Sequence, residues 1–404
     1  MKEGHIILRA PAGRHALEST RSARRPSRGW PEATEFALET SATDAFNVQV
    51  DELDRRDVAR IASEPDVEAV APFMPMKLIA PKDTLADGVY EPKEGGEIAW
   101  GVTAVGADMS QFTGEGIVVA VLDTGIDAGH PAFKGVELAT KNFTGEDEAD
   151  THGHGTHCAG TIFGRDVAGL RVGVARGVKR ALIGKVLGGG GGSSEKIVSA
   201  VQWAVDNGAH IISMSIGIDF PGYQLQLMHQ GLPSLVATSQ ALEGYRKNVL
   251  LFERLASLMN ARTRPVVLIA AAGNESGRDQ TPPFILAVSP PAVSDGFISV
   301  GALGRAHDKL AIAAFSNSGP KVCGPGVNIV SAAIGGGYRT MSGTSMATPH
   351  VAGVAALWAQ KLMKQRNLSA DTLRSSLTAF ASTDMLSGGF EPQDVGSGLV
   401  AAPK

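Results

Sequence analysis

The sequence has few cysteines, few aromatic residues and little net charge. Its two cysteines, Cys158 and Cys323, are too few among 404 residues to form the disulfide framework of a small secreted protein. The formal net charge of −4 provides no excess of positive charge for contacts with phosphates. We therefore expect no nucleic-acid partner and no dependence on an oxidising compartment.

Long hydrophobic runs are also missing. No apolar stretch approaches the roughly 20 residues that a membrane-spanning helix needs. Near the N-terminus only Ile6, Ile7 and Leu8 form an apolar run, which is too short for the core of a secretory signal. We expect a cytoplasmic protein without a membrane partner, although secretion by a non-standard route would fit the same pattern.

Glycine and apolar residues are abundant. The chain contains 49 glycines, is 43% hydrophobic and is only 19% charged. A chain of this length can bury a large core, and glycine-rich loops suit an α/β enzyme. These features indicate one large domain together with a smaller one.

A serine lies at the expected start of an apolar helix. Residues 342–350 read Ser-Gly-Thr-Ser-Met-Ala-Thr-Pro-His, and Val-Ala-Gly-Val-Ala-Ala-Leu-Trp follows. A helix N-terminus offers unpaired N–H groups and partial positive charge, which suit a developing oxyanion. Ser345 is therefore a candidate nucleophile, and the alternative is an ordinary helix cap.

A serine nucleophile needs a general base and a group that orients this base. Residues 116–123 form an apolar run that ends in Asp123, as expected of a buried parallel strand whose carboxyl end faces a site. Residues 150–161 place His154 on a glycine-flanked loop that turns into a second apolar helix. We interpret His154 as the base and Asp123 as its partner.

Four motifs in this order resemble the subtilisin-like serine proteases. They are Val-Leu-Asp-Thr-Gly-Ile-Asp at 121–127, His-Gly-Thr-His at 154–157, Ala-Ala-Gly-Asn-Glu-Ser at 271–276 and Gly-Thr-Ser-Met-Ala-Thr-Pro-His at 343–350. The similarity runs from about residue 100 to about residue 402. The order Asp, His, Ser is that of subtilisin.

The resemblance implies an α/β fold and a mechanism. A three-layer catalytic domain with a mainly parallel sheet would occupy residues 100–404. Ser345 would attack a peptide carbonyl to form an acyl-enzyme, with His154 and Asp123 completing the triad. Asn274 would donate its amide to the oxyanion together with the backbone N–H of Ser345, although an asparagine after a strand is also a common turn residue. The chemistry would require no cofactor.

The resemblance also implies how a peptide or protein substrate binds. An extended substrate would pair with two protein edges, and a pocket beside them would take one side chain. The edges would be Gly190, Gly191 and Gly192 on one side and Ser215, Ile216 and Gly217 on the other, while Ala271, Ala272 and Gly273 would complete the pocket walls. A flexible linker is the alternative for the glycine run. A phosphate loop is disfavoured because no Gly-Lys-Ser or Gly-Lys-Thr follows.

Two metal hypotheses arise from the sequence. His152, His154 and His157 beside Asp150 could form a metal cluster, but their spacing differs from the His-Glu-x-x-His of helical zinc proteases. Asp166 lies in a loop that corresponds to a common calcium site of the family, with few other oxygen ligands nearby. A structural calcium ion at Asp166 is therefore possible.

The N-terminal region has its own pattern. Residues 4–9, 46–50 and 66–71 predict strands, and residues 54–63 predict a helix. This pattern resembles the small α+β, ferredoxin-like prodomain that inhibits subtilisin-like enzymes, here residues 1–76. Residues 77–99, rich in proline, glycine and charge, would be a linker that contains the processing site. The enzyme's own prodomain would then be an intramolecular inhibitor of a self-processing zymogen.

Residues 218–264 form an insertion relative to compact family members. Apolar residues at helical spacing within 235–259 predict an extended surface helix. A role in docking a partner or gating the substrate is the more specific alternative.

These observations together predict a serine endopeptidase. Two alternatives share its residues: a non-catalytic binding scaffold, and an esterase or peptide ligase that uses the same acyl-enzyme.

Overall fold

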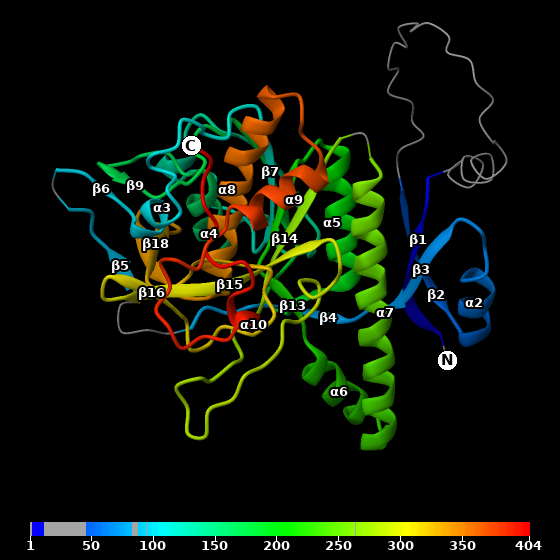
Figure 1. Cartoon of the computed structure of the whole chain (residues 1–404). Coiled ribbons are helices and arrows are strands. Elements are labelled where there is room, and N and C mark those ends of the chain that lie inside the picture. Colours follow the sequence, from blue (N-terminus) through cyan, green and yellow to red (C-terminus); the bar gives the residue numbers. More distant parts are fainter. Residues whose placement is uncertain (1, 12–45, 83–87, 94, 263) are drawn as a thin grey trace, which may run out of the picture.

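A mainly parallel sheet of eight strands forms the centre of the computed structural model, which describes residues 2–11, 46–82, 88–93, 95–262 and 264–404 (Figure 1). The strand order is β16-β15-β14-β12-β7-β10-β8, and β17 also pairs with β15. Only the β15–β16 pair is antiparallel among these strands. The strands are β7 (Val118–Asp123), β8 (Glu137–Asn142), β10 (Arg180–Lys185), β12 (Ile211–Met214), β14 (Val267–Ala271), β15 (Phe297–Ala306), β16 (Lys309–Ile312) and β17 (Val322–Pro325).

Helices cover both faces of this sheet, which confirms the three-layer α/β fold. Along β7, Val119 and Val121 pack into one hydrophobic cluster, while Ala120 and Leu122 pack into the other. This alternation follows from the two-residue period of a strand that is buried on both faces. Helices α4 (His154–Phe163) and α8 (Thr344–Lys364) contribute to the first cluster, and α5 (Ser194–Asp206) and α7 (Ser234–Asn260) to the second.

The N-terminal region forms a small α+β unit beside α7 (Figure 1). Strands β1 (Glu3–Arg9), β2 (Asn47–Leu53) and β3 (Val67–Pro72) form an antiparallel sheet in the order β2-β1-β3, and α2 (Arg55–Ile61) packs on it. These elements agree with the predicted strands and helix. The rest of the expected prodomain, residues 12–45, lies outside the described residues.

Residues 77–99 pair closely with the large α/β domain where they are described. Strand β4 (Pro75–Leu78) lies between β11 (Gly192–Ser193) and β13 (Ile216–Ile218) as the middle strand of an antiparallel sheet. Strand β5 (Gly88–Tyr90) extends the hairpin of β18 (Ile329–Ala332) and β19 (Tyr338–Met341). Strand β6 (Glu97–Ile98) pairs with β9 (Leu170–Arg171). Proline and glycine, which interrupt regular structure, are frequent in this segment, so its composition does not predict these strands. Each strand forms by pairing with a partner that lies far away in the sequence.

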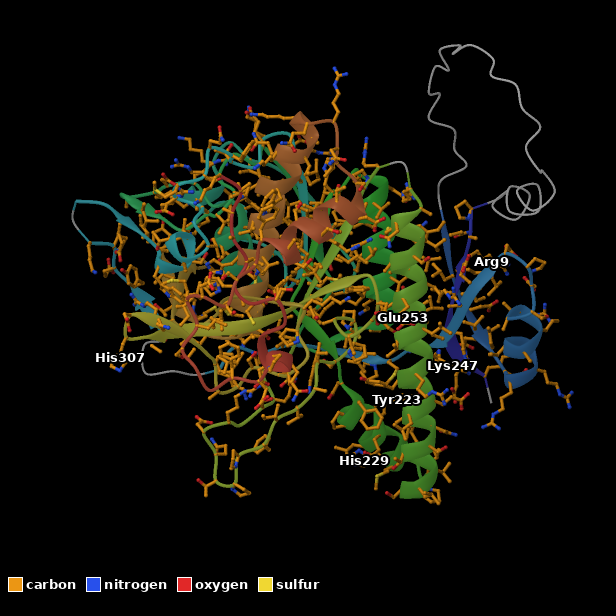
Figure 2. The ribbon with its side chains drawn as sticks, viewed as in Figure 1. Arg9, Tyr223, His229, Lys247, Glu253 and His307 are labelled. Atoms are coloured by element: carbon orange, nitrogen blue, oxygen red, sulfur yellow. The ribbon has the colours of Figure 1, made fainter. Side chains whose placement is uncertain are left out.

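The insertion forms two helices, α6 (Phe220–His229) and α7. Figure 2 labels Tyr223 and His229 on α6, and Lys247 and Glu253 on α7, which contacts strand β3 of the N-terminal sheet. Asn248 of α7 is fully buried, and its Nδ2 donates to the carbonyl oxygen of Pro72 at 2.9 Å. The predicted surface helix is therefore present, and one of its faces contacts the N-terminal unit.

The remaining helices are short or amphipathic: α3 (Trp100–Ala104), the 3₁₀ helix η2 (Pro131–Phe133), α9 (Ala370–Ala379) and α10 (Pro392–Val395). Within the described ranges, none of the helices combines the length and the apolarity that crossing a bilayer requires.

Packing between α8 and the loop around Val174 predicts an effect of Gly353→Ala on stability. A Cβ at Gly353 would lie 2.5 Å from the Cβ of Val174, which cannot swing away because it is the first side-chain carbon. Alanine in a helix gains about 1 kcal/mol over glycine, but overpacking a core costs about 1–3 kcal/mol. We expect a net loss of about 1 kcal/mol or more in the free energy of unfolding, measured with urea in a Ser345→Ala background that removes the predicted nucleophile.

Gly388→Ala is the control, because a Cβ there would meet no atom within 4 Å. Equal urea midpoints for the two variants would contradict the packing argument.

Candidate active site

Three elements bring the predicted triad residues to the carboxyl edge of the sheet. Asp123 is the last residue of β7, His154 is the first residue of α4, and Ser345 lies in the first turn of α8. His154 Nδ1 lies 2.8 Å from Asp123 Oδ1, and both side chains are buried. This contact leaves the other ring nitrogen of His154, Nε2, free to face a nucleophile.

Asp123 controls the protonation of His154. Burial is the largest single influence and lowers the pKa of His154, but the contacts with the Asp123 carboxylate and with Cys158 together outweigh burial and raise this pKa well above its ordinary value. Cys158 lies beneath the pair, with its Sγ 3.8 Å from His154 Nδ1. Burial raises the pKa of the Cys158 thiol, so the thiol is neutral at pH 7.

The Asp150 carboxylate connects the residue that follows Asp123 with the first turn of α4, which carries His154. This carboxylate accepts from Thr124 Oγ1 (2.9 Å), from the backbone N–H groups of His152 (3.1 Å), Gly153 (2.8 Å) and Thr156 (3.0 Å), and from Thr156 Oγ1 (2.6 Å). Burial opposes ionisation, but the hydrogen bonds outweigh it and hold the pKa of Asp150 below its ordinary value. The residue next to Asp123 is thus joined to the first turn of α4.

The sequence did not reveal this positioning role of Asp150. In the sequence Asp150 stands out only as a possible metal ligand, because most of the donors that surround its carboxylate are backbone N–H groups. Its place four residues before His154 was the only available signal.

Asn274 follows β14 and points its amide into the cleft. Its Oδ1 accepts from both the backbone N–H and Oγ1 of Thr344, each at 2.8 Å. These two donors fix the orientation of the amide, so that Nδ2 faces the substrate side, where it donates to the carbonyl oxygen of Ala80 at 2.8 Å. Asn274 therefore has the position of an oxyanion-hole residue and directs an amide donor at a carbonyl oxygen in the cleft.

The chain's own segment 75–82 occupies the cleft. The backbone N–H of Ile79 donates to Ser215 O at 3.2 Å, and Ser345 Oγ donates to Ile79 O at 2.7 Å. His154 Nε2 forms no hydrogen bond with any residue of the described ranges. The hydroxyl of Ser345 is therefore engaged with a peptide carbonyl oxygen and not with His154.

Most of the predicted substrate edges flank this segment. On one side Ile216 pairs with Leu78 and Gly217 with Lys77 in the β13–β4 ladder, and on the other side Gly192 pairs with Met76. A Cβ at Gly191 would lie 3.0 Å from Met76 O, whereas one at Gly190 would meet no atom within 4 Å. Gly191, Gly192, Ser215, Ile216 and Gly217 thus line the strand, and a contact of Gly190 with the substrate stays a prediction.

The side chain of Ile79 lies against Gly217, because a Cβ at Gly217 would come 3.6 Å from Ile79 Cγ1. The same Cβ would lie 3.2 Å from Ser289 Oγ, so Ser289 also borders this pocket, which sequence reasoning missed. The expected walls Ala271, Ala272 and Gly273 are buried at the carboxyl end of β14 and lead directly into Asn274.

The three histidines do not converge as ligands. His157 Nε2 bonds to Ile329 O at 3.0 Å, and burial, with a smaller effect of His154, lowers the pKa of His157 to about 3. Among the described residues, the one group of three ligand-type side chains within reach of a single ion is Asp123, His154 and Cys158, which includes two of the triad residues. Asp166 Oδ2 accepts from Arg176 at 2.6 Å, so its carboxylate already has a cationic partner.

Comparison with known proteins gives a consistent result. A model of the subtilase family matches residues 114–398. The chain is 33% identical over 325 residues to an "Intracellular serine protease" of Paenibacillus polymyxa, covering 77% of this chain and 87% of that protein. It is 32% identical to "Subtilisin Savinase" of Lederbergia lenta (76% of this chain, 97% of that protein) and 35% identical to the "Major intracellular serine protease" of Bacillus subtilis strain 168 (60% and 68%).

The Asp150 network predicts a selective effect of Asp150→Asn on turnover. The new amide nitrogen cannot accept from Thr156, so the first turn of α4 and the base it carries should shift. A misplacement of about 1 Å can cost about 10²-fold, and we expect kcat for peptide hydrolysis to fall about 10- to 100-fold while KM changes little. The acid limb of the pH profile should move to lower pH, because a weaker contact with Asp123 lowers the pKa of His154.

Asp166→Asn is the matched control, since Asp166 is a surface carboxylate that pairs with Arg176, away from the triad. A rise in KM with unchanged kcat and pH profile for Asp150→Asn would contradict the positioning role.

Proposed function

The chain belongs to the subtilase family and is a serine endopeptidase, and on this premise we propose which residues perform the reaction and how the enzyme is controlled. Ser345 attacks the substrate carbonyl, while His154 takes its proton and later delivers it to the leaving amine. Asp123 orients His154 and stabilises the imidazolium. The observation that carries this assignment is the buried Asp123–His154 contact of 2.8 Å beside a serine hydroxyl that faces a peptide carbonyl.

Asn274 stabilises the oxyanion in this proposal. Thr344 holds the oxygen of the Asn274 amide, so that Nδ2 donates into the cleft without reorganisation when negative charge develops. These side chains supply a nucleophile, a base and an electrostatic stabiliser, and subtilase chemistry requires no further cofactor.

Two alternatives can be tested directly. A binding scaffold would not react with a fluorophosphonate probe at Ser345, whereas the proposed enzyme would be labelled there. An esterase or ligase would prefer transfer of the acyl group to an added amine over hydrolysis of a peptide.

Substitutions at the nucleophile and at the oxyanion donor should differ in severity. The corresponding losses measured in subtilisin are about 10⁶-fold in kcat for the nucleophile and about 10²- to 10³-fold for the oxyanion asparagine. We expect Ser345→Ala and Asn274→Ala to follow these values in steady-state assays with a peptide substrate. Adding His154→Ala to Ser345→Ala should lower kcat only slightly further, because the members of a triad act as a unit. Near-normal activity of purified Ser345→Ala would refute the assignment.

The bound segment provides a guide to substrate binding. It pairs with β11 and β13 on either side, as an extended substrate would by strand addition. Ile79 is buried against Gly217, which supports an apolar preference for the residue before the cleaved bond. Ile79–Ala80 is then the bond closest to attack.

We propose that residues 1–76 act as an inhibitory prodomain and that the following residues block the cleft. Ser345 contacts the carbonyl oxygen of Ile79, whereas Asn274 donates to the carbonyl oxygen of the next residue, Ala80. Attack requires the nucleophile and the oxyanion donor at the same carbonyl. Because the two groups are divided between adjacent carbonyls, this arrangement favours inhibition over cleavage until the segment shifts.

The insertion helix α7 and helix α5 together support this role by holding the N-terminal unit in place. Asn248 of α7 donates to Pro72 O, and Gln202 of α5 donates to Phe46 O at 3.1 Å. Met74 also forms two hydrogen bonds with Ser194 at the start of α5. The backbone N–H of Met74 donates to Ser194 Oγ, and the carbonyl oxygen of Met74 accepts from the backbone N–H of Ser194. We propose that residues 218–264 serve chiefly as a docking surface for the enzyme's own N-terminal unit.

Calcium binding at Asp166 stays a prediction. The ion pair with Arg176 would have to open before Asp166 could coordinate an ion, which argues against a tight site. For localisation, two of the relatives are named as intracellular proteases, and we propose the cytoplasm for this enzyme also.

Self-processing should depend on Ser345. We expect the wild-type protein to shorten itself within residues 77–99, with Ile79–Ala80 as the favoured bond, while Ser345→Ala keeps its full 404 residues. Intact-mass measurement after incubation reports the outcome. An active wild-type enzyme that stays full length would refute processing.

Separately produced residues 1–76 should inhibit the processed enzyme and assist its refolding, since a ligand that binds only the folded state stabilises it. If the segment fails to inhibit, the N-terminal unit is a structural extension only.

A further inference from the structure

A cavity of about 620 Å³ adjoins the cleft on the side of the residues that follow the cleaved bond. Its walls come from the loop after Asn274 and from the β15–β16 region. Apolar side chains form part of the lining, among them Phe284, Ile312, Phe315 and Val327. The catalytic mechanism uses none of these residues.

The chain's own segment runs into this cavity. The backbone N–H of Lys82 donates at 2.8 Å to the carbonyl oxygen of Ser342, three residues before the nucleophile. The side chain of Lys82 is exposed and is one of the groups that line the cavity. If Ile79–Ala80 is the cleaved bond, Lys82 is the third residue after it, and a bound substrate would present its third residue here.

Two carboxylates line the same cavity, Glu275 and Asp279. Glu275 is held in place by Asn317, whose Nδ2 donates to Glu275 Oε2 at 2.8 Å while its Oδ1 accepts from the backbone N–H of Glu275 at 3.1 Å. Asn317 is itself buried. A carboxylate with a fixed position recognises a cation with less loss of side-chain entropy than a mobile one.

Among the described residues, one further cation faces the cavity, Arg305. Its guanidinium lies 5.6 Å from the centre of the Trp100 ring, in a cation–π contact. With Lys82 removed, the charged groups that line the cavity within the described ranges are therefore two acids and one arginine that is engaged with an aromatic ring. Without Lys82 these lining groups carry a formal charge of −1, from two acids and one arginine, which favours a cationic guest over an anionic one.

We propose that this cavity is a specificity site for a basic side chain, lysine or arginine, at the third substrate residue after the cleaved bond. The apolar walls would contact the methylene stem and Glu275 and Asp279 the charged end, a division that suits a long basic side chain. The inference rests on the proposed peptidase function and adds a substrate class to it.

Peptides that differ only at this position provide the test. Wild-type enzyme, in the processed form that intact mass identifies, is assayed on peptides with Lys, Ala or Glu at the third position after the cleaved bond. We expect kcat/KM for the Lys peptide to exceed that for the Glu peptide about three- to ten-fold at low salt, and the ratio to fall at high salt. The double variant Glu275→Gln, Asp279→Asn should bring this ratio close to one.

Asp384→Asn is the control, because it removes one exposed acid that does not line the cavity. It should leave the Lys-to-Glu ratio unchanged, which separates a local effect from net charge. Equal rates on the Lys and Glu peptides with wild-type enzyme would overturn this inference alone. Failure to cleave the Ala peptide would refute the peptidase function on which it depends.

A second measurement does not require turnover. In full-length Ser345→Ala, Lys82→Glu should accelerate hydrogen exchange in a fragment that contains residues 75–82 about three-fold or more, whereas Lys82→Arg should not. Repulsion between the introduced carboxylate and the two acids of the cavity would loosen the segment. Identical exchange in the Lys82→Glu and Lys82→Arg variants would overturn the proposal, whatever the kinetic result.

Discussion

The close approach of the α4 N-terminus to the loop after β7 is the constraint on which the site depends. A Cβ at Gly155 would lie 2.1 Å from the carbonyl oxygen of Gly125, so no other residue fits at this position without moving backbone. This contact allows Gly155 N to donate to Thr124 Oγ1, and His154 to reach Asp123 at 2.8 Å. The buried Asp150 carboxylate then joins the two backbones through Thr124 and Thr156. The geometry of the Asp123–His154 pair is thus set by backbone packing before any substrate binds.

The local sequence pattern predicted the strands and helices that carry the site. It did not predict the pairing between strands that are distant in the sequence. A strand or helix that is enclosed by protein must be apolar on several faces. The apolar composition before Asp123 and after Ser345 therefore indicates directly that these two elements are buried. Residues 75–82 carry no such signal, since the strand β4 exists only through pairing with β11 and β13, more than a hundred residues away. The same limit applies to Ser289 and Asp150, whose roles depend on neighbours that folding brings to them.

The occupied cleft explains why the catalytic groups are so deeply buried. Ser345 and His154 are fully enclosed while β4 lies above them. Exclusion of water lowers the pKa of His154 by desolvating the imidazolium and at the same time strengthens its contact with Asp123, which raises this pKa. Departure of the segment would admit water and weaken both effects.

Covalent connection of the N-terminal unit gives the proposed inhibition a further physical property. While residues 75–82 are continuous with the catalytic domain, the segment is present at a high effective concentration that does not depend on the amount of protein. A cut at Ile79–Ala80 would leave β4 and the small sheet bound only through noncovalent contacts, such as those of Asn248 and Gln202. Release would then depend on dilution and on the strength of the α7 contact. The insertion helix would in this way set the threshold at which a processed enzyme becomes active, without touching the triad.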